Sequence, residues 1–154
     1  TACANTTCPS FVLGAVEGDN LFTGTLINAP EDAFDATCSS QSYQDLTFEW
    51  TAPQSGCGTF YTGNGSSDTI LTLFDGCPQA GGVEIACDDD GGDDAPYNGS
   101  TFSSVFTYDV VAGSTYYIGV DSWSSAQSVT FILDVNIDAT SCRRLRARWT
   151  SFAR

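Results

Sequence analysis

The sequence contains no histidine, no lysine and no methionine. Without histidine, the chain cannot build a Ser-His-Asp or Cys-His catalytic system or a histidine-ligated zinc site. A pair of carboxylates could still serve as acid and base in glycoside hydrolysis, but none is recognisably placed in an apolar pocket. We therefore expect that the protein is not an enzyme.

Positive charge is absent from most of the chain. All 19 acidic residues lie between Glu17 and Asp138, whereas the five basic residues are arginines between Arg143 and Arg154. An acidic body of this kind repels the phosphates of nucleic acid and has no attraction for an anionic membrane. We expect no nucleic-acid partner, and divalent cations or a basic segment are the natural partners of the carboxylates.

Long apolar runs are missing too, since no segment has the length of a transmembrane helix and no signal peptide begins at Thr1. Seven cysteines in a chain rich in glycine, serine and threonine indicate an oxidising, extracellular environment. These features predict a secreted protein in its mature form, with no membrane span. Three Asn-x-Ser/Thr triplets agree with an exported glycoprotein, although such triplets also arise by chance. The candidate glycosylation sites are Asn5, Asn64 and Asn98.

Three disulfides are expected from the cysteine positions. Cys77 and Cys87 lie at the two ends of a short loop, so antiparallel pairing would bring them close together. Cys142 is then the odd thiol, and the sequence alone leaves the connectivity open. The expected pairs are Cys77–Cys87, Cys38–Cys57 and Cys3–Cys8.

Short stretches of β-branched and aromatic residues recur along the chain between turn signals. In the segment 45–51, Leu46, Phe48 and Trp50 fall on one face and Thr47 and Glu49 on the other, which predicts a half-buried strand with a solvated side. No segment shows helical periodicity over three turns. About nine such strands predict an all-β fold, an antiparallel β-sandwich or jelly roll. The expected strands are 11–16, 21–27, 45–51, 57–62, 69–74, 83–86, 102–111, 116–120 and 129–135.

The length of 154 residues suits one domain, which we divide into three parts. Residues 1–16 form an N-terminal leader that contains a short apolar run. Residues 17–138 form the β-sandwich. Residues 139–154 form an arginine-rich tail.

A dense group of carboxylates follows the central hairpin, between Asp88 and Asp94. Hard oxygen ligands close together on a glycine-containing loop are what calcium requires, so calcium is a candidate cofactor. A solvated acidic loop is the alternative, and Asp68 could instead accept hydrogen bonds from turn amides. The candidate ligands are Asp88, Asp90 and Asp93, with Asp68, Asp75 or Asp121 approaching from neighbouring strand ends.

Aromatic side chains could provide a surface for stacking on sugar rings. Trp123 lies in a polar turn, between Asp121 and Ser125, and is the best candidate for an exposed aromatic. Trp50 alternates with core residues and is expected in the interior. Trp123 is therefore the candidate ligand-stacking residue.

Several motifs together resemble the bacterial pre-peptidase C-terminal (PPC) domains, in the order in which that family has them. The resemblance covers roughly residues 14–136 and implies a β-sandwich. It also implies an accessory, non-catalytic module that in some members binds calcium or extracellular matrix polymers. The motifs are Phe48-Glu49-Trp50-Thr51-Ala52-Pro53 with Ser55-Gly56, Ser67-Asp68-Thr69-Ile70-Leu71, Phe74-Asp75-Gly76-Cys77, Ala86-Cys87-Asp88-Asp89 and 112–121.

The two ends of the chain depart from the PPC pattern and suggest self-assembly. An exposed sandwich edge readily accepts another strand, and the apolar run 11–16 could supply one to the next molecule. Such a head-to-tail contact does not close and generates a filament, in which the basic tail would suit a neighbour's acidic body. The alternative is that the run pairs within its own sheet. The candidate assembly residues are Phe11, Val12, Leu13 and Val16.

Two functions are consistent with these features. The first is a structural or adhesive protein of the cell surface, the repeating subunit of a fibre built by strand donation. The second is a calcium-dependent, polysaccharide- or matrix-binding accessory module of a secreted enzyme. Both are non-enzymatic.

Electron microscopy and size-exclusion chromatography of native protein separate the two functions. Head-to-tail strand donation produces filaments. An accessory module elutes as a monomer, and this result would contradict the fibre hypothesis.

Overall fold

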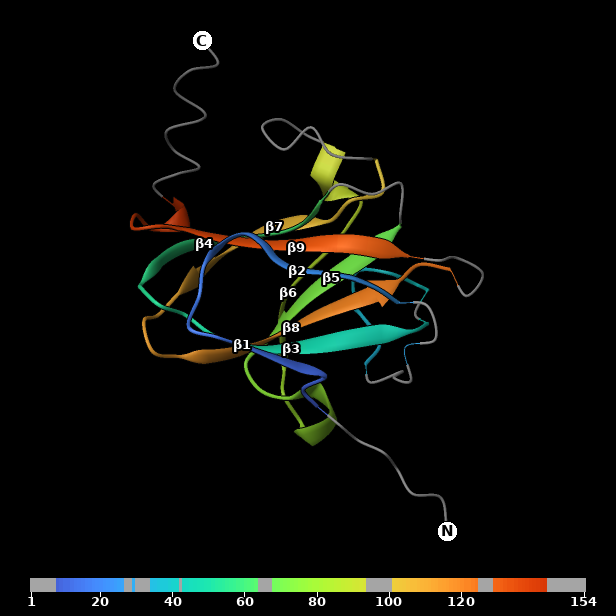
Figure 1. The fold of residues 1–154 in the computed structure, drawn as a ribbon, viewed down its shortest axis with the longest axis horizontal. Coiled ribbons are helices and arrows are strands. Elements are labelled where there is room, and N and C mark those ends of the chain that lie inside the picture. The colour runs from blue at the N-terminus through green and yellow to red at the C-terminus, as the bar shows by residue number, and fades with distance from the viewer. Residues whose placement is uncertain are drawn as a thin grey trace.

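The computed structural model describes residues 8–26, 29, 34–41, 43–63, 68–93, 101–124 and 129–143. The fold consists of nine strands in two sheets, with two short 3-10 turns, so the predicted β-sandwich is confirmed (Figure 1). No helix in this part of the chain has both the length and the apolar character needed to cross a membrane.

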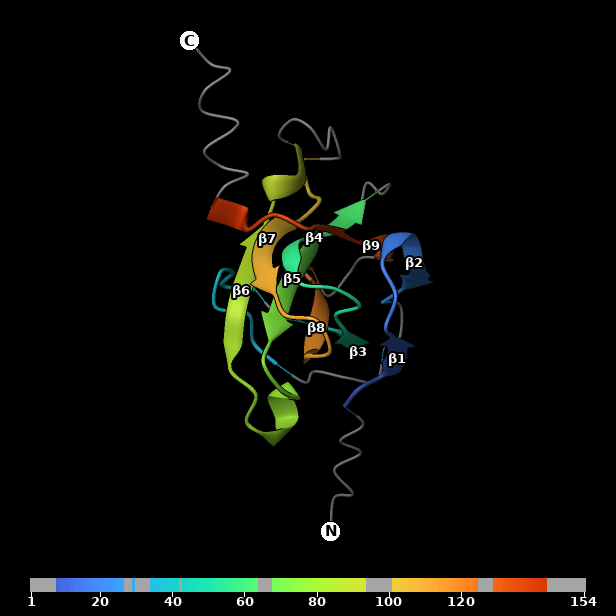
Figure 2. The same cartoon turned by 90° about the vertical axis from the view of Figure 1, so that its left-hand side faces the viewer.

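The strands divide into a five-stranded and a four-stranded sheet. The five-stranded sheet has the order β1-β3-β8-β5-β6, which Figure 2 shows from right to left, and the four-stranded sheet has the order β2-β9-β4-β7. All pairs are antiparallel except β1 and β3, which run parallel. The strands are β1 (Phe11–Gly14), β2 (Gly18–Thr25), β3 (Asp45–Thr51), β4 (Gly56–Gly63), β5 (Thr69–Phe74), β6 (Glu84–Asp89), β7 (Val105–Val110), β8 (Thr115–Ser122) and β9 (Thr130–Asp138).

The core lies between the two sheets and is built from alternate positions on their strands. Leu46, Phe48 and Trp50 of β3 are buried on this side, as their spacing predicts. The indole N–H of Trp50 donates to the Val16 carbonyl at 2.6 Å, which satisfies the one polar group that this ring buries. Alternate residues of β9 complete the facing layer, and these are Phe131, Leu133 and Val135.

The outer face of the five-stranded sheet is covered by the segment 34–41. The Phe34 ring packs edge-on against Phe74 with ring centroids 5.1 Å apart, and Ile70 is fully buried beneath this second, smaller core. Because of this cover, all six residues of β5 are buried. The expected solvated side of β3 is wrong at Thr47, which is fully buried. Its backbone N–H donates to the Ser10 hydroxyl oxygen at 2.9 Å.

The disulfides differ from all three expected pairs. Cys77 and Cys87 do not bond to each other, because each forms a disulfide with a cysteine that is distant in sequence. Cys142 is not the odd thiol, and Cys3 lies outside the described residues. The observed disulfides are Cys8–Cys77, Cys38–Cys87 and Cys57–Cys142. Each disulfide joins a loop or a chain end to the sandwich. The geometry of a single hairpin does not reveal such long-range pairings.

The packing of Phe34 on the sheet depends on Gly119 of β8. A Cβ atom at Gly119 would lie 2.4 Å from the Phe34 ring and 2.3 Å from the Thr72 hydroxyl, so no side chain fits there. We expect Gly119→Ala to displace the segment 34–41 and to lower the free energy of unfolding by ~1–3 kcal/mol, the usual cost of overpacking.

Urea unfolding monitored by fluorescence measures this loss. Gly76→Ala is the matched control, since its nearest neighbour would lie at an ordinary 3.4 Å, and it should change stability by less than ~1 kcal/mol. Equal stability of both variants would show that the segment 34–41 is not packed as described.

Candidate cation and ligand site

The candidate site lies at one end of the five-stranded sheet, where β5 begins and β6 and β8 end. Ile70 pairs with Asp89 on one side, and Thr69 pairs with Ser122 on the other. This register brings Asp68, which precedes β5, next to the last residues of β6. The aspartates after Cys87 therefore do not form a free loop, since Asp88 and Asp89 belong to β6.

Three carboxylates converge at this end. Asp68, Asp89 and Asp90 each offer a carboxylate oxygen, and these oxygens lie within 4.8 Å of one another. Asp90 adopts a left-handed conformation, with a φ of 72°, directly after the end of β6. Hard oxygen ligands at this spacing are suited to a cation such as calcium.

The electrostatics of the cluster also favour a bound cation. Partial burial, together with the charges of Asp90 and Asp89, raises the pKa of Asp68 from 3.8 to about 6. Burial likewise raises the pKa of Asp89, although a hydrogen bond from the Ser39 side chain opposes this. The Oδ1 atoms of Asp68 and Asp89 are buried and accept no hydrogen bond from the described part of the chain. A cation would satisfy these atoms and remove the mutual repulsion.

Other predicted ligands have structural roles instead. Asp88 Oδ2 accepts the backbone N–H groups of Gly91 at 2.9 Å and Val105 at 2.8 Å, so it joins β6 to the start of β7. Asp75 Oδ1 accepts the Val83 N–H at 2.7 Å and closes the β5–β6 turn. Asp121 is fully buried and lies outside the three-carboxylate group. The side chain of Asp93 is not among those described.

The segment 34–41 supports the cluster, a contribution that the sequence did not suggest. Its Cys38 bonds to Cys87, two residues before Asp89, and its Ser39 hydrogen-bonds to the Asp89 carboxylate. Thr37 adds a backbone N–H donated to Glu84 Oε2 at 3.0 Å and a short hydroxyl contact to the other oxygen. Only the cysteines carried a signal in the sequence, and their partners were assigned wrongly.

Trp123 lies directly beside the acidic cluster. Its backbone N–H donates to the Asp68 carbonyl at 3.3 Å, and its side chain is 44% exposed. The exposure expected of this residue is present, whereas Trp50 is fully buried in the core. An exposed indole is a side chain that can stack on the apolar face of a ligand.

Three of the four candidate assembly residues lie on β1, the edge strand opposite β6 in the five-stranded sheet. Phe11, Val12 and Leu13 belong to β1, which pairs with β3 of its own chain, the alternative that the sequence left open. Phe11 and Val12 remain 43% and 68% exposed, and Val16 is 42% exposed. The three candidate glycosylation sites, Asn5, Asn64 and Asn98, lie outside the described residues.

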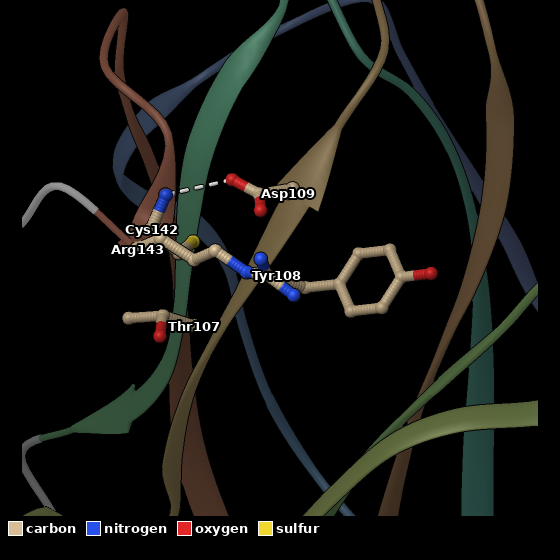
Figure 3. A pocket seen from close by; sticks show the side chains of 5 residues that line it. All are labelled: Thr107, Tyr108, Asp109, Cys142 and Arg143. Carbon is tan, nitrogen blue, oxygen red and sulfur yellow. Dashed lines mark hydrogen bonds between the residues drawn. The ribbon is translucent and has the colours of Figure 1, made fainter. Parts of the chain in front are cut away.

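A separate pocket of about 340 Å³ lies beside β7, lined by Thr107, Tyr108, Asp109, Cys142 and Arg143 (Figure 3). Asp109 Oδ1 accepts the Cys142 N–H at 2.7 Å, and the Tyr108 ring points away from the other four side chains. Cys57 and Cys142 also lie near Asp109, but their sulfurs form a disulfide and cannot bind a metal. One carboxylate and one guanidinium give this pocket no preference for a charged ligand.

Comparison with known proteins adds information on the fold. No family model and no curated protein sequence matches the chain. A solved structure of the pre-peptidase C-terminal domain of a collagenase from Bacillus anthracis is similar, with a TM-score of 0.53 over 86% of this chain and 100% of that domain. The fold is PPC-like. At 12% identity the similarity concerns the fold alone, and the PPC-like sandwich carries three disulfides, which indicate an oxidising environment.

Terbium, used as a luminescent substitute for calcium, tests the cluster. We expect Tb³⁺ emission to be sensitised by the nearby Trp123, and Asp68→Asn or Asp90→Asn to weaken binding roughly tenfold or more. Because the carboxylate must be ionised to bind, affinity should fall as the pH falls through the pKa of Asp68, at about 6.

Asp109→Asn is the control, since it removes one exposed carboxylate far from the cluster. Binding that this control weakens as much as Asp68→Asn would indicate nonspecific attraction to an acidic surface.

In calcium-free buffer, folding should take up a proton at Asp68, so stability should decrease as the pH rises from 3.8 to about 6.

Proposed function

We propose that this chain is a non-enzymatic extracellular module that binds a polysaccharide in a calcium-dependent manner. The binding surface is the sandwich end that carries Asp68, Asp89, Asp90 and Trp123. The observation that carries the proposal is the direct backbone contact between Asp68, a member of the three-carboxylate group, and Trp123, whose side chain is 44% exposed.

The chemistry of this surface suits a neutral sugar polymer. An indole face packs on the apolar face of a sugar ring, and carboxylates or a bound calcium ion bind hydroxyl groups. The formal net charge of −14 opposes an anionic polymer, since the repulsion acts over the whole surface. A matrix protein such as collagen is the alternative polymer, suggested by the resemblance to PPC domains.

The absence of histidine from the sequence and the resemblance to accessory PPC domains support a non-catalytic role. Burial and the neighbouring carboxylates raise the pKa values of Asp68 and Asp89, and a bound cation would offset the repulsion that contributes to these shifts. Accessory modules of this kind act by keeping a secreted enzyme on its polymer. The three disulfides are consistent with secretion, because disulfides persist in oxidising compartments.

Fibre assembly by strand donation is the less favoured proposal. Donation of β1 would require breaking its pairing with β3 and the contacts between Ser10 and Thr47. It would also have to move a segment that the Cys8–Cys77 disulfide fixes to the β5–β6 turn. The exposed apolar side chains of Phe11 and Val12 are the observation in its favour.

Binding to insoluble polysaccharides and to collagen, in calcium and in EDTA, tests the proposal. We expect one polysaccharide to retain the protein in calcium only. Trp123→Ala should weaken that binding about tenfold, or ~1.4 kcal/mol, as expected for the loss of a central aromatic contact.

Val111→Ala is the matched control, because Val111 is 57% exposed at the other end of β7. Unchanged binding by Trp123→Ala would refute the stacking role. Retention by collagen alone would replace the polysaccharide with a matrix protein as the partner.

A further inference from the structure

The Cys38–Cys87 disulfide is the most open to solvent of the three observed disulfides. Cys38 is exposed, and Cys87 is partly buried. A thiol reduces a disulfide by attacking one of its sulfur atoms, so solvent access influences which disulfide reacts first. Access therefore favours attack at Cys38 over attack at the other bonded cysteines. Those others are partly or fully buried, and they are Cys8, Cys77, Cys57 and Cys142.

The two parts of the covering segment 34–41 are held in different ways. The first part is held by burial, since Phe34 and Ala36 are 8% and 5% exposed in the second, smaller core. The second part begins at Thr37, which is exposed, as is Cys38. Burial of apolar surface contributes little at exposed positions. The second part therefore depends on the disulfide and on polar contacts.

The polar contacts of this second part are hydrogen bonds to β6. Thr37 donates its backbone N–H to Glu84 Oε2 at 3.0 Å, at the protein surface. The Ser39 side chain hydrogen-bonds to the Asp89 carboxylate. Water competes for hydrogen bonds at exposed positions, so each of them contributes little to holding the chain in place. The disulfide is thus the main link between residues 37–39 and β6.

The end of β6 is positioned from two directions. β6 is the last strand of the five-stranded sheet, and its pairing with β5 places Asp89 opposite Ile70. The covering segment supplies the second direction, through the disulfide at Cys87 and the hydrogen bond from Ser39. Partners that orient a ligand in this way strengthen its binding to a metal ion.

We propose that the Cys38–Cys87 disulfide is a redox switch for the three-carboxylate group. Reduction releases residues 37–39 from β6, and the Asp89 carboxylate loses its contact with Ser39. The affinity of the group for a cation then falls about tenfold, because loss of the partners that orient metal ligands weakens binding by ~10–100-fold. This inference rests on the proposed function, since it concerns the same cation site.

The reductant is a dithiol, and the reaction is a two-step thiol–disulfide exchange. One thiolate of the dithiol attacks Cys38 Sγ, the bond to Cys87 breaks, and Cys87 leaves as a thiolate that takes up a proton. The second thiolate of the dithiol then attacks its own sulfur in the mixed disulfide, and Cys38 leaves and is protonated in turn. The protein gains two electrons and two protons. The dithiol loses them and becomes a cyclic disulfide.

Thermodynamic linkage makes the coupling reciprocal. If reduction weakens cation binding by a given factor, a saturating cation makes reduction less favourable by the same factor. At a fixed ratio of reduced to oxidised dithiothreitol, saturating calcium should therefore lower the equilibrium ratio of reduced to oxidised Cys38–Cys87 about tenfold. An unchanged ratio would contradict the coupling.

Partial reduction of the wild-type chain, followed by terbium titration, tests the switch without any substitution. After any free thiol has been blocked, low concentrations of dithiothreitol and trapping with iodoacetamide should label Cys38 and Cys87 first, as read by peptide mass spectrometry. Once the reductant is removed, protein labelled at these two positions should bind Tb³⁺ about tenfold more weakly than the oxidised protein. Earlier labelling of Cys57 and Cys142 would overturn the proposal.

A pair of double variants separates the switch from a general loss of stability. Cys38→Ser with Cys87→Ser leaves the segment permanently unlinked and should show the same loss of Tb³⁺ affinity. Cys8→Ser with Cys77→Ser is the matched control, because it removes a partly buried disulfide at the other end of β5 and β6. The control should bind Tb³⁺ as the wild type does, and equal weakening in both variants would refute the switch.

The same titrations distinguish failure of the switch from failure of the cation site. Equal Tb³⁺ affinity of the oxidised wild type and of the chain without the Cys38–Cys87 bond would refute the switch alone. Absence of Tb³⁺ binding by the oxidised wild type would refute the cation site, and the switch with it.

Discussion

The constraint on which the structure depends is an excess of carboxylates with almost no internal cation. The chain places 19 acidic residues before its first basic residue. Buried or crowded carboxylates must then be balanced by backbone N–H groups, by protons or by ions from solution. The fold uses the first of these widely, at Asp75, Asp88 and Asp121, where carboxylates close turns and join strands. At Asp68 and Asp89, one buried carboxylate oxygen on each residue accepts no hydrogen bond from the described part of the chain.

The two sheets explain why the three-carboxylate group lies at one end of the molecule. The space between them is filled by aromatic and aliphatic side chains, and the outer face of the five-stranded sheet is closed by the segment 34–41. Among the described residues, both regions are packed with hydrophobic side chains. Strand ends are free of these demands, so carboxylates and an exposed indole can gather there. The Cys38–Cys87 disulfide then holds the covering segment against β6, which ends at Asp89 and is followed directly by Asp90.

Local patterns in the sequence predicted the strands well. The alternation in β3 and β9 and the composition of β5 define those strands, because each depends on residues within the strand itself. Thr47 was expected in solvent, since nothing in β3 indicates that Ser10 covers its outer face. The disulfides were assigned wrongly for the same reason. A pairing such as Cys8–Cys77 is decided by how distant segments fold together, and neighbouring cysteines give a misleading signal. The sequence predicted a group of carboxylates after Cys87, but it could not show which of them lie together. Asp88 accepts backbone N–H groups at the start of β7, whereas Asp89 lies near Asp68.

The overlapping disulfides have a mechanical consequence. Cys8 is bonded to Cys77 and Cys142 to Cys57, so the shortest covalent route between the N-terminal and C-terminal sides of the sandwich runs along the stretch from Cys57 to Cys77. A pulling force applied across the domain is carried by that stretch, which contains β4 and β5. The remaining strands are bypassed, and the domain can lengthen under tension only by the contour of this short internal section.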